Sequence, residues 1–92
     1  MSASSVRLYR VVEAAVNEAA KDRTAPDWIE RERLVAATAA NGWAAAHGVA
    51  ERITVADVER IEVVAVGHID YVKKLGLAVE SWFEHEPWTV RR

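Results

Sequence analysis

Residues 54–83, TVADVERIEVVAVGHIDYVKKLGLAVESWF, are free of proline, and their apolar residues recur at spacings of three and four. That spacing is typical of an amphipathic helix. Thr54 and Asp57 form the capping-box pattern with which helices often begin. We therefore predict one long helix over about residues 55–85, followed by a tail at 86–92.

The length of this helix predicts self-association. At 1.5 Å per residue, roughly 30 residues span about 45 Å, which is long for a small domain. The chain has 92 residues, of which 51% are hydrophobic and four are Trp. Because a monomer of this size does not easily bury so much apolar material, we expect a homo-oligomer, most simply an antiparallel dimer.

The apolar stripe of the long helix is the predicted oligomer seam, and Gly76 within it favours a close helix crossing. Trp88 lies in the tail, which is either a frayed end or an arm that docks on a neighbouring subunit. The predicted seam residues are Val72, Gly76, Val79, Trp82, Phe83 and Trp88.

Two further helices precede the long one. Asp27 and Glu30 form a second capping-box pattern that predicts a helix over 27–47, and Gly48 suits a left-handed termination. A third apolar stripe predicts a helix over about 5–22, capped by a serine at its start. The fold class is therefore all-α: a single domain, 1–92, forming a three-helix hairpin or bundle that is completed by oligomerisation.

The composition excludes several classes of function. Twelve Lys and Arg against fourteen Asp and Glu give a net charge of -2, which argues against a protein that coats nucleic acid. The absence of cysteine excludes a disulfide scaffold and a thiol nucleophile. The three histidines lack the spacing of a helical zinc motif. We therefore expect a cytoplasmic protein with no membrane partner, no cofactor, no resident metal and no catalytic residue.

Two polar residues fall on apolar helix faces. Glu32 lies on the inner face of the helix predicted over 27–47, and His68 lies near the centre of the apolar stripe of the long helix. Because an unpaired polar group in a core costs about 1–3 kcal/mol, we predict that they pair with each other. The alternatives for His68 are a core histidine satisfied elsewhere, including across a two-fold axis, and a histidine that contacts a ligand.

A cluster of polar residues surrounds His68. Tyr71 lies near Gly67 and Lys74, and together they could form a shelf for a planar anionic ligand; the alternative is a solvated surface on which Asp70 and Lys74 form a helical ion pair. In an oligomer, the C-terminal arginines could add to such a basic pocket. The candidate ligand- or partner-binding residues are Gly67, His68, Asp70, Tyr71, Lys74, Arg91 and Arg92.

Glu59 and Glu62 form an E-x-x-E pattern with Asp70 on the same polar face. The pattern resembles that of all-α nucleotide pyrophosphohydrolases, which hold Mg²⁺ with it. Those proteins pair it with a second acidic helix motif that this chain lacks, and Lys73 among the acids favours a solvated face. A metal-dependent nucleotide hydrolase is therefore the weakest functional alternative.

The motif Gly67-His68-x-Asp70-Tyr71-x-x-Lys74 resembles a pattern of small uncharacterised bacteriophage and prophage proteins, over about a third of the chain. Gly76 and Ala78 depart from it, because bulkier residues are expected there. The resemblance implies a phage or prophage accessory protein and brings no established activity with it. We expect a non-enzymatic interaction protein, located in the host cytoplasm if a phage encodes it. Two classes fit: an antagonist of host defence that binds a host protein or sequesters a nucleotide signal, and a structural or assembly component of the virion.

Overall fold

A computed structural model of the protein describes residues 6–84, and within that range the chain is helical with no strand. The all-α class is confirmed. The elements are α1 (Leu8–Ala19), the 3₁₀ turn η2 (Ala20–Asp22), α2 (Trp28–Ala46), α3 (Val55–Glu59) and α4 (His68–Glu84).

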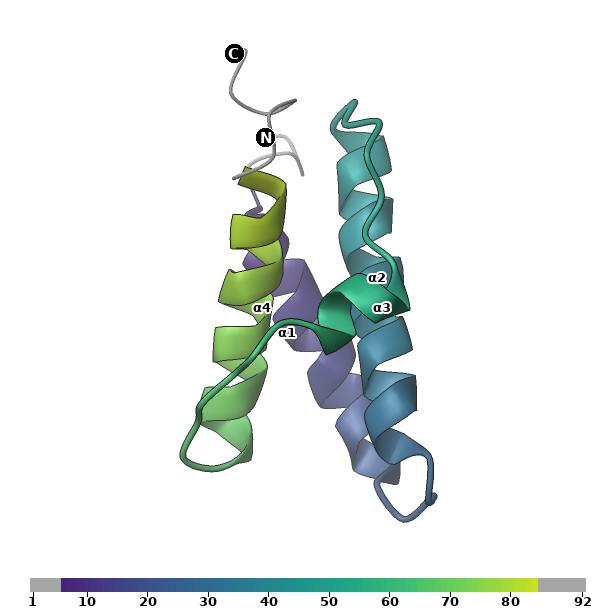
Figure 1. Ribbon diagram of the computed structural model, residues 1–92, viewed down its shortest axis with the longest axis vertical. Helices are drawn as coiled ribbons and strands as arrows, with labels where there is room; N and C mark the ends of the chain where they lie inside the picture. The colour runs from purple at the N-terminus through teal and green to yellow at the C-terminus, as the bar shows by residue number, and fades with distance from the viewer. Residues whose placement is uncertain (1–5, 85–92) are drawn as a thin grey trace.

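Helix α1 is the central helix of the fold. Both α2 and α4 pack along it, whereas α2 and α4 make few contacts with each other. Figure 1 shows α2 and α4 on either side, with α1 behind them and α3 lying across the opening in front. The connection from α3 to α4 then crosses this opening, so it closes the face that α1 leaves uncovered.

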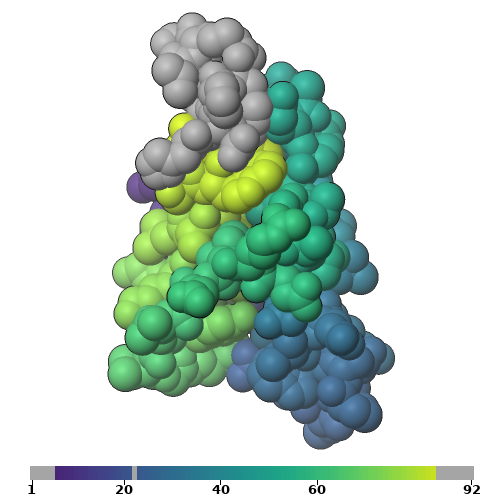
Figure 2. Space-filling view, in the orientation of Figure 1, coloured from purple at the N-terminus to yellow at the C-terminus, as the bar shows by residue number. Residues whose placement is uncertain are grey.

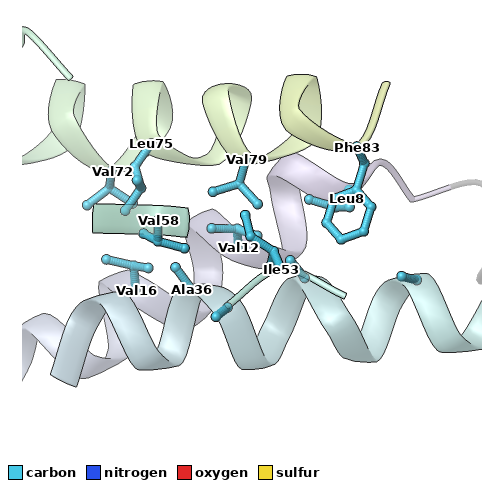
Figure 3. Close-up of a cluster of buried hydrophobic side chains, with 13 residues drawn as sticks. Leu8, Val12, Val16, Ala36, Ile53, Val58, Val72, Leu75, Val79 and Phe83 are labelled. Atoms are coloured by element: carbon cyan, nitrogen blue, oxygen red, sulfur yellow. The ribbon is translucent and has the colours of Figure 1, made fainter. Parts of the chain in front are cut away.

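The core lies where these elements converge (Figure 3). Valines at four-residue intervals on α1 face alanines of α2 and the apolar stripe of α4, while Ile53 and Val58 fill the remaining space. Burial of this apolar surface is the main stabilising contribution. The buried hydrophobic residues are Leu8, Val12, Val16, Ala36, Ala37, Ala40, Ala44, Ile53, Val58, Val72, Leu75, Val79 and Phe83.

A carboxylate from α4 forms a hydrogen bond at the N-terminus of α1. Arg7, the residue before α1, makes no side-chain cap. Instead, the buried Glu80 accepts a hydrogen bond from the Tyr9 amide at 3.4 Å and forms an ion pair with Arg7. Since unpaired amides and positive dipole charge gather at a helix N-terminus, Glu80 stabilises α1 and fastens it to α4.

The predicted end of α2 is confirmed and its predicted capping box is wrong. Gly48 has a φ of 74°, and the amide of Val49 reaches back to the carbonyl of Ala44 at 2.8 Å, which together close the helix. At the other end, Asp27 makes no side-chain cap, and its φ of -98° and ψ of 25° differ from the extended conformation usual for an N-cap residue.

The capping box of Thr54 and Asp57 is confirmed, but the helix that it begins is short. The predicted continuous helix over 55–85 is wrong: α3 ends at Glu59, and a non-helical connection leads to α4. Four of the six residues at 61–66 are β-branched and disfavour a helix. Gly67 then turns the chain with a φ of 94°, which residues with a side chain rarely adopt.

The predicted seam is largely the inner face of the monomer. Val72, Gly76, Val79 and Phe83 are buried within a single chain. The predicted close crossing at Gly76 does occur, but between α4 and α1, since a Cβ at Gly76 would lie 2.7 Å from the Tyr9 carbonyl oxygen. Trp82 packs partly buried against the core. The predictions on the serine cap and on Trp88 fall outside the described residues.

Candidate functional site

A pocket of about 350 Å³ opens between the start of α2 and the start of α4. Figure 2 shows the surface hollowed there, between the blue start of α2 and the green connection that precedes α4. Its apolar wall consists of Ile29, Val58, Ile61, Val63 and Leu75. Its remaining lining is aromatic, polar or open: Arg23, Trp28, Arg33, Gly67, His68 and Tyr71.

One of the two pocket arginines is committed to a buried carboxylate. Arg23 donates two hydrogen bonds to Glu32, at 2.7 and 2.9 Å, and its guanidinium lies 4.4 Å from the centre of the Trp28 ring. Glu32 is only 2% exposed. The sequence therefore correctly predicted a buried Glu32, but its partner is Arg23. Because the pair is bidentate and stacked, it is a fixed part of the wall.

His68 begins α4 and contacts α1, while Glu32 is bonded to Arg23, so the predicted Glu32–His68 pair is not formed. Its Nε2 lies 3.1 Å from Oδ1 of Asn17. Because an amide oxygen accepts hydrogen bonds, Nε2 is the donor in this contact. Nδ1 is buried, and no group in residues 6–84 pairs with it.

The second pocket arginine is only loosely held. Arg33 donates through Nη1 to Glu59 at 3.3 Å, and the Glu59 side chain is well exposed. Tyr71 is half-buried beside it, and burial, followed by the charge of Glu32, raises the pKa of its phenol above the ordinary value. The phenol therefore stays protonated at neutral pH and can donate a hydrogen bond into the pocket.

Asp70 and Lys74 lie outside the pocket lining. Both form hydrogen bonds with the backbone of the segment that connects α3 to α4. They form an ion pair at 2.9 Å. Asp70 also accepts from the amide of Val66 at 3.1 Å, and Lys74 donates to the carbonyl of Val64 at 3.2 Å. The hydrogen bonds to Lys74 and then Val66 lower the pKa of the Asp70 carboxyl.

The structure thus divides the predicted cluster. Gly67, His68 and Tyr71 line the pocket, while Asp70 and Lys74 hold its edge in place. The predicted contributions of Arg91 and Arg92 lie outside the described residues. Arg23 and Arg33 were missed as pocket residues because nothing in the spacing of the sequence indicates that the start of α2 faces the start of α4.

The connection itself forms a second candidate surface, over residues 61–66. Its side chains alternate: those of Ile61, Val63 and Ala65 are partly buried, while Val64 and Val66 are 87% and 89% exposed. Ile69, at the start of α4, is 80% exposed. Such alternation is typical of a half-buried strand. The run IEVVAV carried this signal, but the longer three–four spacing masked it.

This strand-like segment has no strand partner among residues 6–84. Within that range, the backbone groups of Val63 and Ala65 make no hydrogen bond. Two neighbouring backbone groups do form hydrogen bonds, both with α4: the Val64 carbonyl accepts from Lys74, and the Val66 amide donates to Asp70. One edge is therefore bonded to α4, whereas the backbone groups of Val63 and Ala65 on the other edge, called the open edge below, are unbonded within residues 6–84.

The acidic residues of the E-x-x-E pattern are not gathered into one site. The Glu59 carboxylate pairs with Arg33 and that of Asp70 with Lys74. In the described part of the chain, no group of three or more His, Asp or Glu is placed to hold a metal ion. None of the described helices is long and apolar enough to span a membrane.

No protein-family model, curated protein or solved structure matches this chain.

Proposed function

We propose that this protein is a non-enzymatic interaction module that acts as a homo-oligomer, assembled by pairing of the segment 61–66 with the same segment of a second copy. The observation that supports this proposal is the coincidence of highly exposed Val64, Val66 and Ile69 with an open backbone edge. Both exposed apolar surface and unpaired strand edges favour association.

The open edge determines how the two segments pair. In an extended chain, the N–H and C=O of one residue point to the same side, and those of the next residue point to the opposite side. Since Val64 and Val66 direct theirs toward α4, Val63 and Ala65 direct theirs outward. An antiparallel pair in which Val63 bonds to Ala65 of the second copy uses all of these open groups.

This register is also favourable for the side chains. It places Val64 opposite the second copy's Val64, and Glu62 opposite its Val66, so that two exposed valines cover each other and the two glutamates stay apart. Pairing with a second copy is therefore self-complementary. Strand addition of this kind obtains affinity from the main chain and specificity from the alternating side chains.

The biological setting that we propose follows from the G-H-x-D-Y-x-x-K resemblance: a phage accessory protein in the host cytoplasm, acting on a host protein. A virion component is the second setting, because strand-mediated assembly serves it equally well. The hydrolase alternative has no support in the geometry, since Glu59 and Asp70 are each paired with a basic side chain.

Sedimentation equilibrium of the full chain tests the proposal. We expect a dimer for the unaltered protein and a monomer for Val64→Lys, because a cation opposite its own copy opposes pairing. Leu34→Lys is the matched control: Leu34 is also an exposed apolar residue, at 54%, but it lies on α2. This variant should remain dimeric.

The mass also provides the outcomes that would overturn the proposal. An unaltered protein that is monomeric at all concentrations would contradict self-association. A Val64→Lys variant that stays dimeric would place the interface elsewhere. Circular dichroism of each variant checks that its helices are intact, so that a change in mass reports association alone.

A further inference from the structure

We infer that the pocket between the starts of α2 and α4 is a binding site for a small planar monocarboxylate, an aromatic acid with its carboxylate on Arg33 and its ring against the apolar wall. This inference is independent of the proposed self-association, because it concerns the inward side of the segment 61–66 and not its open edge.

The size and lining of the pocket favour a compact apolar body. Its volume, about 350 Å³, is at the lower end of the range for small-molecule sites. One wall is formed by the branched side chains of Ile61, Val63 and Leu75, and Trp28 contributes an aromatic surface. A flat ring between such surfaces is removed from water without leaving polar atoms unpaired.

The charges in the lining favour a single negative charge on the ligand. Arg23 is neutralised by the buried Glu32 through two hydrogen bonds, so it has little to offer an anion. Within residues 6–84, Arg33 makes one hydrogen bond, to an exposed carboxylate, and the rest of its guanidinium has no bonded partner there. One available cation suits a monocarboxylate but does not balance a polyphosphate. The pocket therefore favours a monocarboxylate over the nucleotide ligand that the sequence suggested.

The ligand binds when its carboxylate replaces that of Glu59 on Arg33. The ion pair with Glu59 is single and long, at 3.3 Å, and exposed pairs of this kind contribute little. An incoming carboxylate can form two parallel bonds with the guanidinium, while Glu59 returns to water. The protonated phenol of Tyr71 supplies a further donor at the pocket wall.

Isothermal titration of the full chain with 2-naphthoate, and separately with the neutral 2-naphthamide, tests the inference. We expect 2-naphthoate to bind at least about tenfold more tightly than the amide, since hydrogen bonds to charged groups are the stronger ones. Arg33→Gln should remove that preference. Glu59→Gln should strengthen 2-naphthoate binding severalfold, because it releases Arg33 from its competitor.

Matched controls come from a neighbouring ion pair on the same helix. Arg31 and Asp27 form a pair similar to that of Arg33 and Glu59, but neither lines the pocket. Arg31→Gln and Asp27→Asn repeat the two changes in net charge, and both should leave 2-naphthoate binding unchanged.

Several results would overturn the inference: no binding of 2-naphthoate, equal binding of acid and amide, or an equal loss in Arg33→Gln and Arg31→Gln. If Arg33→Gln does not fold, the decision falls on Glu59→Gln. That variant keeps every pocket-lining residue, and unchanged or weaker binding by it would contradict the carboxylate exchange.

Discussion

Helices α1 and α4 come close together at Gly76, where a Cβ would collide with the Tyr9 carbonyl. A Cβ there would lie 2.7 Å from the carbonyl oxygen, which is backbone and cannot move without shifting a helix. Gly42, on α2, is the matched site: it is also helical, and a Cβ there would meet nothing within 4 Å.

Alanine at these two glycines should therefore have opposite effects. Gly76→Ala should lower the free energy of unfolding by about 1–3 kcal/mol, the usual cost of overpacking. Gly42→Ala should raise it by about 0.5–1 kcal/mol, because alanine restricts the unfolded chain and favours the helix. Urea unfolding measures both. A stabilising Gly76→Ala would contradict the close crossing.

The ion pair of Arg23 and Glu32 offers a second test at the scale of single residues. Arg23→Leu leaves a buried carboxylate without its partner and should destabilise the protein by about 1–3 kcal/mol. The double variant Arg23→Leu, Glu32→Leu should recover part of this loss, because no buried charge remains. Urea unfolding of Arg23→Leu, Glu32→Leu and the double variant measures the free energy of unfolding of each. If the double variant loses as much as the two single variants together, the residues are not coupled.

Single residues were predicted best where a local pattern has one physical explanation. The left-handed Gly48 and the Thr54–Asp57 capping box were both predicted from sequence neighbours, whereas the equally local Asp27–Glu30 pattern did not form a cap. The partner of Glu32 was not, because the choice between His68 and Arg23 depends on how the turn between α1 and α2 brings residue 23 over the start of α2.

At the scale of elements, the predicted and observed structures differ most in the segment 61–67, which was expected to be helical and is not. Its apolar residues fit a helical spacing and an alternating one, and short apolar runs do not distinguish the two. The β-branched residues and Gly67 determine the outcome in favour of an extended connection. The error had consequences: a continuous helix would expose its stripe as a seam, whereas the interrupted one folds α4 back onto α1.

The attachment of this segment to α4 should depend on pH. The pKa of the Asp70 carboxyl is lower in the folded protein than in the unfolded chain, so its contribution is complete above the ordinary pKa of about 3.9 and is lost as pH falls through the lower folded value. The amide proton shift of Val66, followed by NMR, should titrate below pH 4. In Asp70→Asn this titration should be absent; its persistence would mean that another group holds the segment.

At the scale of the whole molecule, the all-α class was predictable because three apolar stripes with helical periodicity leave few other arrangements. The order of packing was not. The stripes alone do not show that α1 lies between α2 and α4, or that the segment around α3 covers the open face. As a result, the pocket and the open strand edge, both of which depend on that cover, were found only in the structure.

The central claim, that two copies pair through the segment 61–66, can be tested directly because the chain contains no cysteine. Val64→Cys places one thiol at the centre of the proposed antiparallel pair, where directly opposite Cβ atoms lie close enough for a disulfide. Under mild oxidation at low concentration, it should form a covalent dimer much faster than Leu34→Cys. Equal rates for the two variants would contradict the pairing.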